Sequence, residues 1–126
     1  MARSKLATRA LRACCLTACL VQPTAWAASR CATLDADARR LGTRIAGCEA
    51  GRVVAGKGRL VLHTAPAVHC QTEKLFVIPG DKLIAYTEYA GYTAVLYLHP
   101  KTGREADGWV ASSRLSPTGT GIAPCP

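Results

Sequence analysis

Three histidines and one cysteine are the residues best suited to chemistry in this 126-residue chain. His63, His69 and His99 are spaced six and then thirty residues apart, and Cys70 follows His69 directly. This spacing fits no recurrent zinc motif, and no Cys-x-x-Cys pair occurs in the sequence. A Cys–His peptidase would require Cys70 as a free thiol, a histidine base and a third group that orients the base. An oxidised, structural Cys70 is the simpler interpretation, so we predict no enzyme, no metal site and no cofactor.

A second chemical motif, Lys-Thr-Gly, occupies residues 101–103. It matches the third element of penicillin-recognising serine enzymes, which also need a Ser-x-x-Lys helix and a Ser-Asp-Asn loop. Residues 28–126 contain neither of these. The tripeptide separates two apolar runs, so we predict a hairpin turn in which Gly103 adopts a positive φ.

The first 27 residues have the organisation of an export signal. Residues 1–12 carry four of the sixteen Lys and Arg and no acid. A short apolar run follows, and Ala25 and Ala27 stand at the positions that a signal peptidase reads. The run is far shorter than the roughly 20 residues that span a bilayer, so no stable membrane span is expected. We predict cleavage after Ala27 and a periplasmic or secreted protein; in the alternative, Leu-Thr-Ala-Cys at 16–19 is a lipobox and Cys19 carries a lipid anchor.

In the remaining chain, the distribution of charge limits the class of partner, and the cysteines predict disulfide bonds. Residues 28–126 hold all eight acids and twelve of the bases, a net charge of +4. Because these bases are scattered, nucleic acid is not expected as a partner. Four cysteines in a small exported chain predict two disulfides, for which three pairings exist. We favour Cys48 with Cys70 and Cys31 with Cys125.

The elements that position these residues are predicted to be one helix followed by strands. Apolar residues recur at intervals of four, three and four, which predicts a short amphipathic helix that begins near Thr33. Its apolar residues are Leu34, Ala38, Leu41 and Ile45. From residue 58 onward, apolar runs between Pro- and Gly-rich turns predict antiparallel strands.

Two of the predicted strands are apolar on both faces. In residues 82–89, Leu83 and Ala85 point to one side of the sheet, whereas Ile84 and Tyr86 point to the other. A sheet with one solvated face would carry polar residues at alternate positions. We therefore expect a cover over the second face, either the helix through Leu34, Leu41 and Ile45 or a partner protein.

Four sequence pieces follow one another between residues 58 and 115. They are an apolar strand ending in Thr-Ala-Pro (60–66), two strands around a Gly-centred turn (76–86), the pattern Gly-Tyr-x-x-Val-x-Tyr (91–97), and Lys-Thr-Gly with a later Gly-Trp-Val and a final Leu (101–115). In order and spacing they resemble the bacterial SH3-like (SH3b) domain family of exported cell-envelope proteins. The resemblance implies a mainly β fold with a small barrel of about five antiparallel strands. The expected segments are a signal peptide (1–27), a helix and lead-in (28–57), the SH3-like barrel (58–116) and a C-terminal tail (117–126).

The resemblance also implies binding without catalysis. Many members bind peptide or cell-wall components, and an exposed aromatic groove is what receives an extended peptide in SH3-like barrels. Here the groove would consist of Tyr89, Tyr92 and Trp109, and Lys101 and Arg104 on the adjacent turn would meet a carboxylate of a peptide stem. We expect a protein that binds peptide or peptidoglycan.

An inhibitor is the alternative function. Small size and disulfides equally suit a periplasmic inhibitor or immunity protein that acts on a cell-wall hydrolase. Such proteins commonly insert a loop into a cleft, and residues 63–74, tethered at Cys70, are the candidate loop. The partner would then be a periplasmic protein instead of peptidoglycan.

Overall fold

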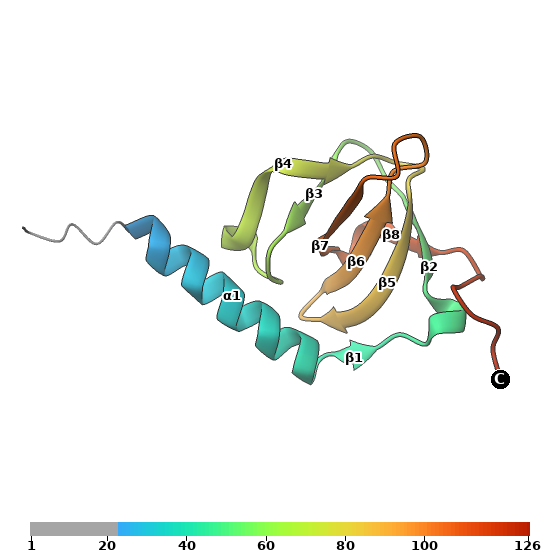
Figure 1. Ribbon diagram of the computed structural model, residues 1–126, viewed down its shortest axis with the longest axis horizontal. Helices are drawn as coiled ribbons and strands as arrows, with labels where there is room; N and C mark the ends of the chain where they lie inside the picture. The colour runs from blue at the N-terminus through green and yellow to red at the C-terminus, as the bar shows by residue number, and fades with distance from the viewer. Residues whose placement is uncertain (1–22) are drawn as a thin grey trace, which may run out of the picture.

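An N-terminal helix and a strongly curled antiparallel sheet make up the protein (Figure 1). The computed structural model describes residues 23–126. The helix is α1 (Pro23–Leu41), and the strands are β1 (Thr43–Arg44), β2 (Gly51–Val54), β3 (Leu60–His63), β4 (Gln71–Val77), β5 (Lys82–Tyr89), β6 (Tyr92–Leu98), β7 (Glu105–Ala111) and β8 (Leu115–Pro117). Three short 3-10 helices are η1 (Gly47–Glu49), η2 (Val68–Cys70) and η3 (Ser112–Arg114). The predicted mainly β class with a preceding helix is confirmed.

The predicted strand number is wrong, because the sheet has eight strands instead of about five. Their order is β4-β3-β7-β6-β5-β2-β8, and β1 pairs with β5. The additional strands, β1, β2 and β8, are two to four residues long. Elements this short carry no readable alternation of polar and apolar residues, and they become strands only because neighbours in space hydrogen-bond to them.

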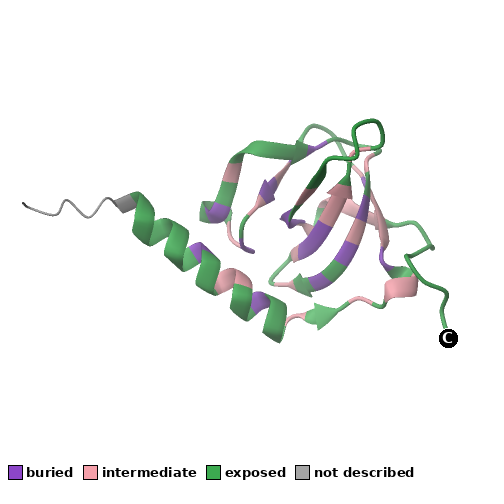
Figure 2. Ribbon diagram, in the orientation of Figure 1, coloured by how far each residue is buried: buried purple, intermediate pink, exposed green. Residues whose placement is uncertain are grey.

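The residues of the main core come from several strands of the curled sheet, on which buried segments alternate with less buried ones (Figure 2). On β5, Leu83 and Ala85 are buried in this core, whereas Ile84 is half-buried and Tyr86 is exposed on the outer face. The predicted division of this strand into two faces is therefore confirmed. The core consists of Val54, Leu60, Leu62, Val77, Leu83, Ala85, Val95 and Val110.

The helix begins and ends earlier than predicted. Thr33, the expected first residue, lies in the middle of α1, and its hydroxyl donates to the carbonyl of Ser29 at 3.1 Å. The helix ends at Leu41 because the chain turns there to pair Arg44 with Thr87 of β5. A side chain at Gly42 would lie 2.5 Å from Thr87 Cγ2 and 2.7 Å from the carbonyl oxygen of Glu88, so only glycine permits this close approach.

The helix covers part of the outer face of the sheet, through residues other than those predicted. Fully buried Ala38 packs on Ala94 and Trp109. Of the predicted contacts, Leu34 packs against the Cys31–Cys70 pair, Leu41 is exposed, and Ile45 lies beyond the helix against the main core. The helix contacts the sheet through the small side chain of Ala38, which lets the helix approach closely enough to bury Trp109.

The predicted disulfide pairing is wrong. The structure joins Cys31 to Cys70 and Cys48 to Cys125, with Cα–Cα distances of 5.7 and 4.9 Å. Cys48 does not pair with Cys70, nor Cys31 with Cys125. The arrangement of the chain is the reason. The helix brings Cys31 to η2, and the tail runs beside η1, where the Ile122 amide donates to the Gly47 carbonyl at 2.9 Å. Two disulfides indicate an oxidising compartment.

The hydrophobicity of the described helices is too low, or their length too short, for any of them to cross a bilayer.

Candidate ligand-binding groove

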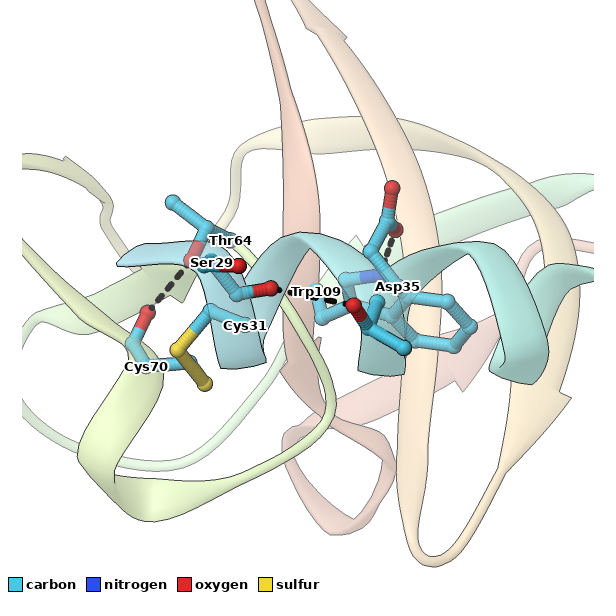
Figure 3. Close-up of a disulfide and its surroundings, with 7 residues drawn as sticks. Ser29, Cys31, Asp35, Thr64, Cys70 and Trp109 are labelled. Atoms are coloured by element: carbon cyan, nitrogen blue, oxygen red, sulfur yellow. Dashed lines mark hydrogen bonds between the residues drawn. A yellow bond between two sulfur atoms is a disulfide. The ribbon is translucent and has the colours of Figure 1, made fainter. Parts of the chain in front are cut away.

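The three aromatic residues predicted to form an exposed groove do come together, but beneath α1. Trp109 is fully buried, with half-buried Tyr89 and Tyr92 packed around it. Its indole Nε1–H donates to Asp35 Oδ1 at 2.6 Å (Figure 3). The same carboxylate accepts a bond from Arg39 Nε at 2.8 Å, and the Arg39 guanidinium lies 5.6 Å from the centroid of the indole ring. Trp109 therefore fastens the helix to the sheet and does not present a surface to a ligand, which corrects the prediction for this residue.

Lys101 and Arg104, the predicted cationic residues, lie on the turn between β6 and β7 and are both exposed. His99 organises this turn: its Nδ1 accepts the backbone N–H groups of Lys101 and Thr102 at 3.2 Å each. Gly103 has a φ of 68°, as predicted for the hairpin. The Lys-Thr-Gly tripeptide is thus a turn that presents Lys101 to solvent at the edge of the sheet.

A hollow of about 450 Å³ lies beside this turn. We call it the Phe76 groove; its walls are Phe76, Ile78, Asp81, Tyr97, His99, Pro100 and Lys101. Phe76 and Ile78 lie on the same side of the chain at the end of β4, and both are exposed, while Val77 between them points into the core. Of the predicted residues, only Lys101 reaches this groove. The sequence contained one signal for this groove, the apolar run Leu-Phe-Val-Ile at 75–78. A continuous apolar run places apolar side chains on both faces of a strand, and the face that the core does not cover is available to a ligand.

The polar groups of the groove carry both signs of charge. Asp81 Oδ2 accepts the backbone N–H of Ile78 at 2.9 Å, which fixes the carboxylate at one wall, and Lys101 stands at the rim. The Arg59 guanidinium lies 4.3 Å from the centroid of the Phe76 ring, so a cation supports the aromatic wall. Burial raises the pKa of the Tyr97 hydroxyl, and the nearby Asp81 carboxylate raises it further. The Tyr97 hydroxyl therefore keeps its proton to a higher pH than an ordinary tyrosine.

The raised pKa of Tyr97 predicts a loss of stability at alkaline pH. Above pH 10.0, the ordinary pKa of tyrosine, the unfolded chain releases this proton while the folded chain retains it. The unfolded state then binds fewer protons than the folded state, so the free energy of unfolding falls as the pH rises. Denaturant titrations at several pH values should show a smaller decrease above pH 10 in Tyr97→Phe than in the parent. Tyr86→Phe, at an exposed tyrosine, controls for loss of a hydroxyl; an equal decrease in parent and Tyr97→Phe would contradict the assignment.

Cys31, His69 and Cys70 lie close enough together to bind a metal, but the two cysteines form a disulfide. Ligand atoms of Cys31, His69 and Cys70 lie within 4.8 Å of one another, but the two sulfur atoms are joined to each other. They therefore offer no thiolate to a metal ion or a substrate. The disulfide instead braces the loop that was predicted to enter a hydrolase: the Thr64 amide donates to the Cys70 carbonyl at 2.8 Å, and Val68 at the loop tip is 76% exposed.

No protein-family model, curated protein or solved structure matches this chain. Its function is therefore inferred from the geometry of the two exposed sites, the Phe76 groove and the Val68 loop tip.

Proposed function

We propose that this is an exported, non-enzymatic SH3-like protein of the bacterial envelope that binds an extended peptide, such as a peptidoglycan stem, in the Phe76 groove. The observation that carries the proposal is a hollow that combines an exposed apolar wall, Phe76 and Ile78, with two charges of opposite sign, Asp81 and Lys101. Aromatic and aliphatic walls bind apolar parts of a peptide with little loss of conformational entropy. Lys101 would meet a carboxylate of the stem, and Asp81 an ammonium group.

The position of β4 supports an extended ligand. This strand is at one end of the strand order, where it pairs with β3. Phe76 lies in β4, and Ile78 follows directly after it. Extended peptides bind to such edges by adding main-chain hydrogen bonds, while alternate side chains enter adjacent pockets. A stem peptide that lies in the groove would therefore run beside β4.

Export by a cleaved signal peptide is part of this proposal. Cleavage after Ala27 would remove the first turns of α1, in which residues 24–30 are all exposed. Among the residues whose burial the structure describes, Cys31 is the first that is buried, so the described contacts of the helix with the sheet would survive processing. Cys19, the alternative lipid-attachment site, lies outside the described residues. The mass of the N-terminal peptide from the envelope fraction would distinguish the two.

Binding to purified sacculi and to a soluble stem peptide tests the groove. Phe76→Ala is expected to weaken binding of the stem peptide by roughly tenfold, since anchoring aromatics at an interface contribute more than 1 kcal/mol. Lys101→Ala should weaken it too, with a loss that shrinks at high salt. Leu75→Ala is the matched control, because Leu75 is a neighbour of equal exposure (44% against 43% for Phe76) outside the groove. Equal binding by Phe76→Ala and Leu75→Ala would rule out the groove.

Inhibition of a cell-wall hydrolase is the second candidate, favoured by the exposed Val68 at the tip of a disulfide-braced loop. A rigid loop with an apolar tip suits insertion into an enzyme cleft, because little entropy is lost on binding. Hydrolase assays separate the two functions. Inhibition that Val68→Lys abolishes and Phe76→Ala leaves intact would favour the inhibitor, and the reverse pattern for sacculus binding would favour the groove.

A further inference from the structure

The outer face of β5 and β6 is only partly covered by α1. The helix lies over Ala94 and Trp109, toward one end of these strands. Beyond it, Ile84 and Leu96 face each other across the strand pair. Tyr86, at the irregularity in this pairing, shares a hollow with Leu96, and Leu98 lies two residues further along β6. Ile84 and Leu96 are half-buried, Tyr86 is exposed, and Leu98 is 53% exposed. We call these four residues the outer apolar face.

Acidic residues border one side of the outer apolar face. On β7, Asp107 pairs with Leu96 and Glu105 pairs with Leu98, so both carboxylates lie on the same side of the sheet as the apolar residues. Both are exposed. A hollow of about 450 Å³ separates them from Tyr86, and Arg39 of α1 also lines it, with its Nη2 atom 3.9 Å from Asp107 Oδ2.

Basic residues border the opposite side. Arg44 of β1 lies alongside β5, and a second hollow of about 380 Å³ lies between it and Tyr86. Lys82 stands two residues before Ile84 on β5, and therefore on the same face. Both side chains are exposed. The face thus carries two acids on the β7 side, an apolar centre, and two bases on the β5 side.

We propose that the outer apolar face pairs with the same face of a second copy of this chain, forming a two-fold symmetric dimer. A two-fold interface must be complementary to itself, because each surface residue i meets j while j meets i. Rotation about an axis that lies in the interface, parallel to the strands and through the apolar centre, lays the β7 border of one copy, with Glu105 and Asp107, against the β5 border of the other, with Arg44 and Lys82. A partner with one sign of charge would find repulsion on one side of the face.

The net charge of residues 28–126 strengthens this choice of occupant. Residues 28–126 carry a net charge of +4, so two copies repel each other over most of their surfaces. Arg39, which lines both hollows, forms an ion pair with Asp35 at 2.8 Å and so adds one charge of each sign. With two further acids and two further bases at its borders, the outer apolar face is locally neutral and is where two copies can approach. Burial of Tyr86 and Leu98 would then supply the attraction.

Sedimentation equilibrium of the purified, oxidised protein over a concentration series tests the dimer. The parent is expected to show twice the mass of one chain, and Leu98→Lys half the parent's mass, because two lysines would face each other in an apolar interface. Leu75→Lys is the control, since it makes the same change at a leucine of similar exposure on β4. A monomeric parent, or a Leu98→Lys protein that dimerises like Leu75→Lys, would overturn the proposal.

Charge reversal tests the orientation of the two copies. Glu105→Lys with Asp107→Lys makes both borders basic, and Arg44→Glu with Lys82→Glu makes both acidic. Each double variant alone should be monomeric, whereas a one-to-one mixture should form a heterodimer, because only the mixture restores opposite charges. A mixture that stays monomeric, or double variants that dimerise alone, would contradict this two-fold arrangement. None of these residues lines the Phe76 groove, so sacculus binding by Leu98→Lys reports on the proposed function separately.

Discussion

Trp109→Ala is expected to lower the free energy of unfolding by about 4 kcal/mol, the range observed when a fully buried tryptophan is truncated. Trp109 is the largest fully buried side chain, and it connects two parts of the molecule. Its ring packs against Ala38 of the helix and Ala94 of the sheet, and its Nε1–H bonds to Asp35. The substitution would leave a cavity beneath α1 and remove a donor from a partly buried carboxylate. Urea unfolding followed by far-UV circular dichroism measures the loss.

Two further variants show whether the effect comes from packing at this position. Trp109→Phe keeps most of the ring but removes the hydrogen bond to Asp35, and should cost about 1–2 kcal/mol. Phe76→Ala removes an exposed aromatic ring and should cost less than about 1 kcal/mol. If Trp109→Ala were no more destabilising than Phe76→Ala, Trp109 would not be the buried anchor of the helix.

Removal of either disulfide is expected to cost about 4 kcal/mol, and removal of Cys48–Cys125 somewhat more than removal of Cys31–Cys70. A cross-link stabilises mainly by restricting the unfolded chain, and the effect grows with the length of the closed loop. The sequence separations are 77 and 39 residues. Thermal unfolding of the paired Cys→Ala variants measures both losses. Alanine is used because Cys31 and Cys70 are buried, and serine there would place hydroxyl groups in an apolar cluster. A larger loss for Cys31–Cys70 would contradict the order expected from loop length.

The pairing itself can be read directly from a non-reduced tryptic digest. Trypsin separates all four cysteines, because Lys or Arg residues lie between each pair. Peptide 31–39 should be linked to 60–74, and peptide 45–52 to 115–126. A digest in which 45–52 is linked to 60–74 would instead restore the pairing expected from sequence and contradict the structure.

The local features of the sheet could be predicted because a few neighbouring residues specify them. The alternation of Leu83 and Ala85 with Ile84 and Tyr86 identifies the two faces of β5, whichever strands lie beside it. The turn at Gly103 follows from its place between two apolar runs, since only glycine adopts a positive φ without steric cost. The candidate site was predicted only at Lys101, which lies on that turn.

The rest of the site could not be predicted because it depends on what covers each surface. Trp109 and Phe76 both lie next to a valine in strands that also carry charged residues, and nothing in their immediate neighbours distinguishes an aromatic ring under a helix from one in a groove. In the structure α1 buries Trp109, while Phe76 stays exposed at the end of β4. Trp109, which was predicted to be exposed, is therefore buried, and Phe76, for which no role was predicted, is exposed.

The sequence by itself determined the mainly β class, the preceding helix, the positions of the longer strands, and the presence of cysteines enough for two disulfides. Only the tertiary structure decided which cysteines pair, which aromatic residues reach the surface, and that β1, β2 and β8 join the sheet. The physical reason is that strand and helix periodicity is repeated every few residues, whereas long-range pairing has no local signature. Each doubling of a loop costs only about 0.6 kcal/mol in closure entropy, so sequence separation barely favours one cysteine partner over another. The packing of α1 across the sheet and of the tail beside η1 makes that choice.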